Sequence, residues 1–180
     1  MDLLARRVAA QYADELAKHR DSRGGKLCAA YFSFTACIGM GKMVGATPDG
    51  RKAAQPLANS LCATQGHVGN GPSELLKSAA KTNQRRALGG TSLLLDLHPS
   101  VVRCSGDTDP LATMIRTYFG LGGTHVEFTL VDEARLRQAQ REPERFQDIT
   151  IRVAGYSAKF VALSRELQEH VIERLRTVRP

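Results

Sequence analysis

The segment at residues 152–160 contains a glycine whose backbone could do chemistry that no other residue type supports. Ile149, Ile151 and Val153 alternate as in a strand, and Gly155 follows two residues later. A peptide glycine that loses one α-hydrogen becomes a carbon-centred radical, which the neighbouring nitrogen and carbonyl delocalise when the α-carbon is planar. Glycine alone has no Cβ to crowd that plane. Taken by itself, the segment favours an ordinary turn glycine, because glycine is common in turns.

The four cysteines are the other candidate reactive groups. Cys28, Cys37, Cys62 and Cys104 include no CxxC pair, and no cysteine–histidine cluster has the spacing of zinc ligands. We interpret them as free thiols of a reducing, cytoplasmic compartment. Each is expected to be a small buried or incidental side chain rather than a carrier of a radical. The sequence therefore predicts no metal site.

Two histidines and one glycine-rich stretch receive no catalytic role. His98 and His125 could transfer protons, since histidine titrates near neutral pH, but a lone histidine is more often structural. The stretch at residues 66–71 lacks the GxxxxGK[ST] pattern of a phosphate-binding loop.

The first part of the chain mixes helical periodicity with loop composition. Leu4, Val8 and Tyr12 recur at helical spacing and predict a helix over residues 2–19. Residues 27–38 are apolar and predict a buried strand, although periodicity alone leaves a buried helix open. Residues 39–72 are rich in Gly, Pro, Asn and Asp and predict a long loop.

The rest of the chain alternates between strand and helix patterns, which predicts an α/β fold. Asp109 and Asp132 are expected to cap the helices that follow them. The predicted elements are a helix over 73–82, a strand over 91–98, a helix from 110, a strand over 124–131, a helix from 133 to near 142, a strand over 149–153, and a helix after Ser164.

Charge and hydropathy exclude several classes of protein. The chain has 180 residues and a formal net charge of +7, but its basic residues are scattered and no aromatic residues interleave with them. A nucleic-acid interface needs both signals, so we predict a solvated basic surface or a face for an acidic partner. No apolar run is long enough to cross a membrane, and the N-terminus lacks a signal-peptide pattern. We expect a cytoplasmic protein that binds neither nucleic acid nor membrane.

Several segments resemble one family in the same order along the chain. Residues 152–160, RVAGYSAKF, resemble the glycyl radical signature of the pyruvate formate-lyase family, in the branch of glycerol and propanediol dehydratases and choline trimethylamine-lyase. Further matches to that branch lie at residues 45–51 (GATPDGR), 116–119 (RTYF), 136–140 (LRQAQ) with Pro143, and 164–168 (SRELQ) with Arg174. The ordered set makes the resemblance strong and favours the radical interpretation of Gly155.

The resemblance implies a fold and a mechanism. The fold would be the terminal portion of a glycyl-radical-enzyme-type barrel with a C-terminal glycyl loop and a closing helix. Gly155 would carry the radical, installed by a separate activating enzyme that uses S-adenosylmethionine and an iron–sulfur cluster, and no cofactor would be bound permanently. The radical would then pass to a catalytic cysteine. Residues that would support the radical loop are Arg152, Val153, Ala154, Tyr156, Ser157 and Ala158.

The chain departs from the family in three respects. Family members are several times longer, and none of the four cysteines has the Gly-Cys-Val-Glu-like context of the catalytic cysteine. The stretch Glu127-Phe128-Thr129 stands where Gln-Phe-Asn is usual, which puts the local contacts there in doubt.

Three functions follow as hypotheses. The favoured one is the radical-bearing small subunit of a split glycyl radical enzyme of the dehydratase or lyase type, whose larger chain carries the cysteine. The alternatives are a spare part that restores an oxygen-damaged full-length enzyme, and a catalytically silent assembly module. We expect residues 1–123 to form the end of the barrel region, with the loop at 39–72, and residues 124–180 to form the glycyl radical domain. Apolar surface at Leu93–Leu95 and Phe128 is expected to be exposed without a partner.

Overall fold

The computed structural model describes residues 2–33, 35–64, 71–102, 109–153 and 155–177. Short 3-10 turns occupy Gln84–Arg86, Pro99–Val102, Pro143–Arg145 and Phe160–Ala162. The helices and strands are α1 (Asp2–Ala17), α2 (Ala36–Lys42), α3 (Gly71–Ala80), β1 (Leu94–Leu97), α4 (Pro110–Gly120), β2 (Glu127–Leu130), α5 (Glu133–Arg141), β3 (Thr150–Arg152), β4 (Ser157–Lys159) and α6 (Arg165–Thr177).

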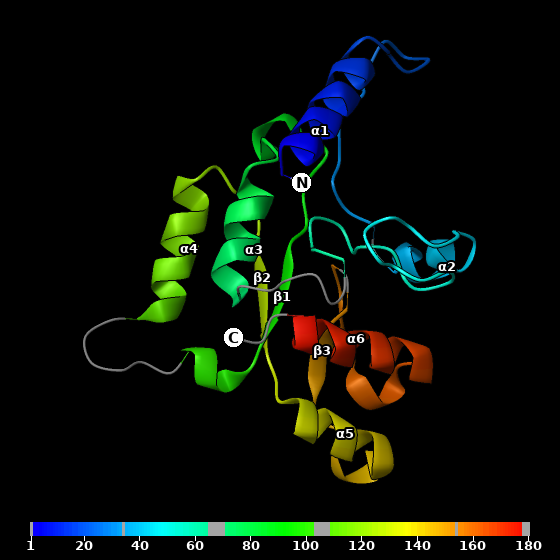
Figure 1. Ribbon diagram of the computed structural model, residues 1–180, viewed down its shortest axis with the longest axis vertical. Coiled ribbons are helices and arrows are strands. Elements are labelled where there is room, and N and C mark those ends of the chain that lie inside the picture. Colours follow the sequence, from blue (N-terminus) through cyan, green and yellow to red (C-terminus); the bar gives the residue numbers. More distant parts are fainter. Residues whose placement is uncertain (1, 34, 65–70, 103–108, 154, 178–180) are drawn as a thin grey trace.

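A parallel pair of strands forms the centre of the molecule (Figure 1). β1 pairs with β2 in parallel, with Leu94 opposite Glu127 and Leu97 opposite Leu130. The connection between the two strands contains α4, as a parallel pair requires a crossover. α3 and α4 pack against each other beside this pair, and their apolar faces bury Leu93, Leu95 and Tyr118.

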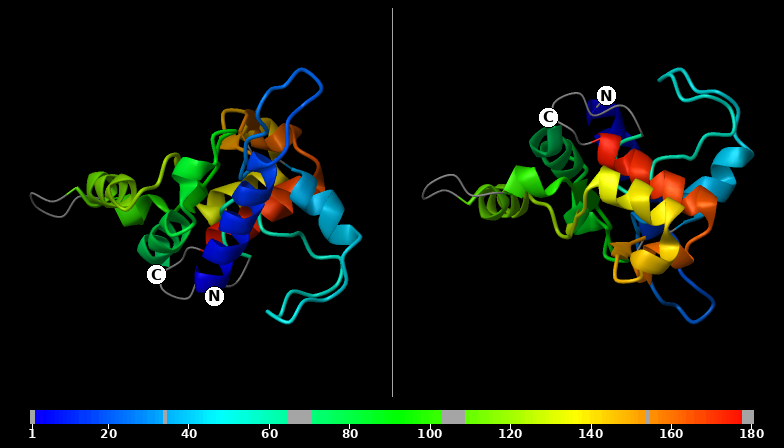
Figure 2. Two further views of the ribbon diagram at one scale, coloured as in Figure 1. Left: turned by 90° about the horizontal axis from the view of Figure 1, so that it is seen from above. Right: turned by 90° about the horizontal axis from the view of Figure 1, so that it is seen from below.

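The C-terminal third of the chain forms a second cluster around an antiparallel hairpin. β3 pairs with β4, with Arg152 opposite Ser157. α5 and α6 cover this hairpin, and Leu136, Ile151, Phe160 and Ile172 are completely buried between them. α6 also contacts β1, so this cluster lies on the other side of the central strands from α4 (Figures 1 and 2).

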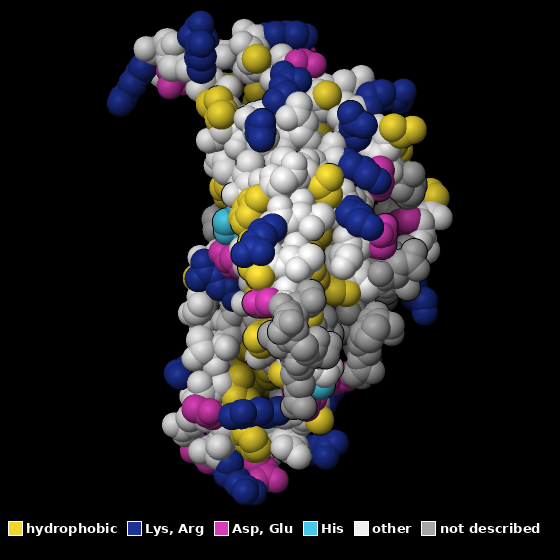
Figure 3. Space-filling model, turned by 90° about the vertical axis from the view of Figure 1, so that its left-hand side faces the viewer, with side chains coloured by type: hydrophobic (Ala, Val, Ile, Leu, Met, Phe, Trp, Pro, Cys, Tyr) yellow, Lys and Arg dark blue, Asp and Glu magenta, His cyan; other side chains and the backbone are white. Residues whose placement is uncertain are grey.

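The first helix and the region around α2 extend away from these two clusters (Figure 2). α1 leaves Leu3, Leu4, Val8 and Tyr12 exposed, and Ala13 is its buried residue. On the face shown in Figure 3, basic side chains are scattered and become more numerous toward the end that carries α1. Within the described segments, no helix is both long and apolar enough to span a bilayer.

Local signals predicted the helices well. The Asp109 carboxylate accepts a hydrogen bond from the Ala112 amide (3.0 Å), and Asp132 accepts one from the Ala134 amide (2.8 Å), so both predicted caps are confirmed. The predicted strands near 91–98, 124–131 and 149–153 are present in shorter form as β1, β2 and β3.

Two expectations were wrong. Residues 27–38 do not form a strand in their described part: Tyr31 makes a single bridge to Thr91, and α2 begins at Ala36. Leu93, Leu94 and Leu95 are not exposed: they are 0%, 5% and 0% exposed, and α3 and α4 cover Leu93 and Leu95. Phe128 is partly buried against the same cluster. The predicted loop at 39–72 includes the end of α2 and the start of α3, and residues 43–64 contain no helix or strand.

Candidate functional site

Gly155 lies at the tip of the β3–β4 hairpin. The Val153 amide donates a hydrogen bond to the Tyr156 carbonyl (2.9 Å), so the chain reverses direction within the residues between them. Gly155 has φ +82°, a conformation in which a side chain is strained. The hairpin therefore favours a glycine at its tip, and the predicted strand-to-turn geometry is confirmed.

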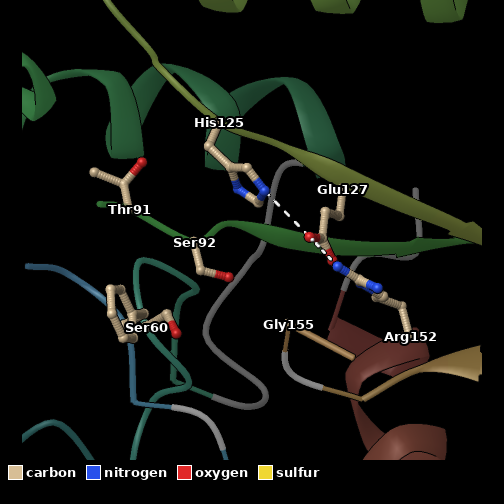
Figure 4. A pocket seen from close by; sticks show the side chains of 8 residues that line it. Ser60, Thr91, Ser92, His125, Glu127, Arg152 and Gly155 are labelled. Atoms are coloured by element: carbon tan, nitrogen blue, oxygen red, sulfur yellow. Dashed lines mark hydrogen bonds and ion pairs between the residues drawn. The ribbon is translucent and has the colours of Figure 1, made fainter. Parts of the chain in front are cut away.

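A pocket of about 220 Å³ opens beside Gly155 (Figure 4). Most of its lining residues have polar side chains, and they come from segments far apart in the sequence: loops near residues 32 and 60, the approach to β1, the start of β2, and the hairpin. The lining residues are Phe32, Ser60, Thr91, Ser92, His125, Glu127, Arg152 and Gly155.

Glu127 connects β2 to the hairpin. Arg152 Nη2 donates to Glu127 Oε1 (2.9 Å) and Arg152 Nε donates to Oε2, which makes a two-point ion pair. His125 Nε2 lies 3.1 Å from the same Oε1. Figure 4 shows His125 and Arg152 approaching this carboxylate from opposite sides. The hydrogen bond from Arg152 holds the pKa of Glu127 below its usual range, so the carboxylate is ionised at neutral pH.

Arg174 of α6 fixes the backbone just before Gly155. Its Nη1 donates to the Val153 carbonyl (2.8 Å) and its Nη2 donates to the Arg152 carbonyl (2.9 Å). Its Nε donates to Asp96 Oδ2 of β1 (2.6 Å). Because both side chains are buried, the hydrogen bonds satisfy the guanidinium inside the protein.

The structure distributes the predicted loop residues between the core and the surface. Val153 is buried, Arg152 and Ala158 are partly buried, and Tyr156 and Ser157 are exposed. Arg152 Nη1 donates to Ser157 Oγ (3.3 Å) across the hairpin. Ala154 lies outside the described residues.

The described cysteines are not arranged for chemistry at this pocket. Cys37 is buried and Cys62 is partly buried; burial raises the pKa of Cys37 and raises that of Cys62 to about 11. The Cys62 thiol lies 3.3 Å from the Leu94 carbonyl, to which it donates. Cys28 is exposed, and Cys104 lies outside the described residues. Among the described residues, no group of His, Cys, Asp or Glu side chains could hold a metal ion.

Sequence reasoning missed most of the pocket. The sequence favours a structural role for His125 and gives no signal for Ser60, Thr91 and Ser92. The one available signal was Glu127, which stands where the resemblance leads one to expect glutamine. The role of Glu127 depends on Arg152, which lies 25 residues further along the chain and contacts Glu127 only in the folded structure.

Comparison with known proteins gives a match to one protein family. The model of the family described as "Glycine radical" matches residues 57–161, more than half of the chain. Trans-4-hydroxy-L-proline dehydratase of Clostridioides difficile is 34% identical over 173 residues, which cover 96% of this chain and 22% of that enzyme. Isethionate sulfite-lyase of Bilophila wadsworthia is 34% identical over 176 residues, which cover 97% of this chain and 20% of that enzyme.

Solved structures of related enzymes have the same fold as this chain. The glycerol-bound B12-independent glycerol dehydratase from Clostridium butyricum superposes with a TM-score of 0.90 at 37% identity. The match covers 97% of this chain and 22% of the dehydratase chain. The chain thus spans about a fifth of the length of the curated relatives it matches.

Proposed function

This chain belongs to the glycine radical family, and we propose that Gly155 is its radical residue. It corresponds to the C-terminal glycyl radical portion of dehydratase- and lyase-type enzymes, and its fold is that portion of their barrel. The observation that carries the proposal is the hairpin: Gly155 lies within the matched residues, at an exposed tip, in a conformation that favours glycine.

The proposed role is to store the radical for a larger partner chain. Enzymes of this family carry a glycyl radical installed by a separate activating enzyme. Here that enzyme, with S-adenosylmethionine and an iron–sulfur cluster, would remove one α-hydrogen from Gly155. The Gly155 radical would then take the hydrogen atom of a cysteine thiol on the partner, which leaves a sulfur radical to attack the substrate and restores the glycine.

Two features support a cysteine from another chain. The described cysteines do not line the pocket beside Gly155, and the thiol of Cys62 donates to the Leu94 carbonyl and accepts from the Leu94 amide. The chain also spans only about a fifth of its relatives. We therefore favour the radical-bearing small subunit of a split enzyme.

The proposed reaction is bond cleavage of the lyase type. The names of the relatives include dehydratases, a sulfite-lyase and a decarboxylase, so cleavage of carbon–oxygen, carbon–sulfur and carbon–carbon bonds all occur among them. A division at residues 123/124 into barrel end and glycyl radical domain is also proposed. The two hydrophobic clusters support a division into two parts, with the first cluster extending past residue 124 to include Val126 and Phe128.

Activation requires that Gly155 reach the active site of another protein. We propose that residues 145–180 swing outward to present it. Hydrogen exchange with and without the activating enzyme tests this motion. Protection over 145–180 that equals that of Leu93–Leu97 under both conditions would contradict it.

The test of function is electron paramagnetic resonance under anaerobic conditions. The chain is incubated with a matched activating enzyme and S-adenosylmethionine, with and without a candidate large chain, beside a Gly155→Ala control. We expect a carbon-radical doublet that is absent from the control, and cleavage of the chain at Gly155 on exposure to air. Dependence of turnover on the large chain supports the split enzyme. Restoration of a cleaved full-length enzyme supports a spare part, and no radical with any partner supports a silent module.

A further inference from the structure

We propose that Glu127 is a positioning residue that restrains the opening of the Gly155 hairpin through its ion pair with Arg152. The proposal concerns the mobility of the hairpin, and its relevance to radical chemistry rests on the function proposed above. Glu127 does not belong to the hairpin; it begins β2, on the parallel pair that the hairpin would leave.

The geometry of the ion pair is that of a strong restraint. Two nitrogens of Arg152 engage both oxygens of the Glu127 carboxylate, so the guanidinium is fixed in orientation as well as in position. Arg152 ends β3, three residues before Gly155. Any outward movement of the hairpin tip relative to β2 must therefore stretch or break this pair.

The partial exposure of the Arg152–Glu127 ion pair allows it to break when the hairpin moves. The side chain of Arg152 is 35% exposed and that of Glu127 is 18% exposed, so water can solvate both charges when they separate. The Arg174–Asp96 pair is different, since its side chains are 8% and 2% exposed. Arg174 also bonds the carbonyls of Arg152 and Val153, which fastens the hairpin to α6.

The contacts of Glu127 favour positioning over direct contact with a substrate. Both carboxylate oxygens accept from Arg152, and Oε1 is also shared with His125 Nε2 (3.1 Å). A carboxylate engaged in this way has little capacity left for a ligand in the pocket. The hydrogen bond from Arg152 lowers the pKa of Glu127, so the ionised form that makes the pair dominates at neutral pH.

Hydrogen–deuterium exchange of the full chain tests the restraint. Glu127→Gln keeps the shape of the side chain and restores the residue usual in the resembling branch, but it removes the charge. We expect exchange at the amides of residues 155–158 to become about fivefold faster, as for the loss of a partly exposed ion pair. Raising the salt concentration should speed exchange there in the unmodified chain and have little effect in Glu127→Gln.

Asp148→Asn is the matched control. It removes an ion pair with Arg135 (2.9 Å) in the same C-terminal cluster, on the α5 side of the hairpin and outside the lining of the Gly155 pocket. It should leave exchange at 155–158 unchanged. If Glu127→Gln leaves these amides as protected and as salt-sensitive as in the unmodified chain, or if Asp148→Asn speeds them equally, the proposal is wrong.

A parallel resonance experiment separates this proposal from the proposed function. If the unmodified chain and Glu127→Gln both fail to form a radical with any activating enzyme, the function assigned to Gly155 is overturned, and the exchange comparison still decides the role of Glu127. If a radical forms in both while exchange is unchanged, the restraint alone is overturned.

Discussion

Arg174 of α6 and Asp96 of β1 form a buried ion pair of 2.6 Å that joins the last helix of the chain to its central strands. The same guanidinium holds the carbonyls of the two residues at the end of β3. A single side chain thus links the central strands, the closing helix and the strand that leads to Gly155. This arrangement makes the position of the hairpin depend on a charge buried on a different element.

Removing one partner of this pair should destabilise the fold strongly. Asp96→Ala leaves the Arg174 charge buried and uncompensated, so we expect a loss of about 3–5 kcal/mol in the free energy of unfolding. Chemical denaturation measures it. Asp148→Ala, which breaks an exposed pair with Arg135, serves as the control and should lose less than about 1 kcal/mol. Equal losses of unfolding free energy in the two variants would show that the buried pair stabilises the fold no more than the exposed pair does.

The buried hydroxyl of Tyr118 should contribute to the stability of the fold. Tyr118 is completely buried, and its hydroxyl lies 3.0 Å from both Gln84 Oε1 and the His125 carbonyl. Tyr118→Phe removes a buried hydrogen bond and is expected to lower the free energy of unfolding by about 1 kcal/mol. Tyr12→Phe, on the exposed face of α1, should be neutral in the same denaturation experiment.

His170 predicts a particular dependence of stability on pH. Burial lowers the pKa of His170 from 6.5 to about 4, so the folded protein keeps this imidazole neutral where the unfolded chain protonates it. Stability is therefore fully present above about pH 6.5 and is lost as the pH falls toward 4. The contribution is about 3 kcal/mol across this range.

Denaturation midpoints measured between pH 7.5 and 4.5 check this assignment. In His170→Gln the decline over this range should be much smaller, whereas His19→Gln, at an exposed position after α1, should retain it. A decline that is the same in all three proteins would assign the pH dependence to other groups.

The cysteines should differ sharply in reactivity. Alkylation at pH 8 proceeds through the thiolate, and the Cys62 pKa of about 11 leaves almost none of it. We expect iodoacetamide to modify the exposed Cys28 and to leave Cys37 and Cys62 unmodified in the folded chain. Peptide mass spectrometry before and after denaturation measures this. Rapid labelling of folded Cys62 would reopen the question of a catalytic thiol within this chain.

The sequence predicted those parts of the fold that local chemistry determines. Asp109 followed by Pro110 signals a helix start through the capping carboxylate and the fixed φ of proline, and both features need only neighbouring residues. Gly155 was predicted at a turn for a similar reason, since the alternation before it ends there. These features can be predicted from the sequence because neighbouring residues determine them and tertiary contacts are not needed.

The errors arose where tertiary contacts decide. A short apolar run such as residues 27–38 fits a buried strand or helix equally well, and here Leu27 and Phe32 are each 40% exposed in an irregular segment. Leu93 and Leu95 were expected at an open surface because the packing of α3 and α4 over them could not be read from the sequence. The pairing of Glu127 with Arg152 likewise exists only because β3 lies beside β2.

The packing of the closing helix α6 would hold the folded structure together even if the backbone were cut at the hairpin tip. Residues after Gly155 remain attached to the rest through Phe160, Val171 and Ile172, all completely buried, and through the contacts of Arg174. A backbone break at the hairpin tip would therefore yield a nicked protein whose two pieces stay together. Size-exclusion chromatography would not detect this cleavage. It would be visible only after denaturation, as two fragments in place of the intact chain.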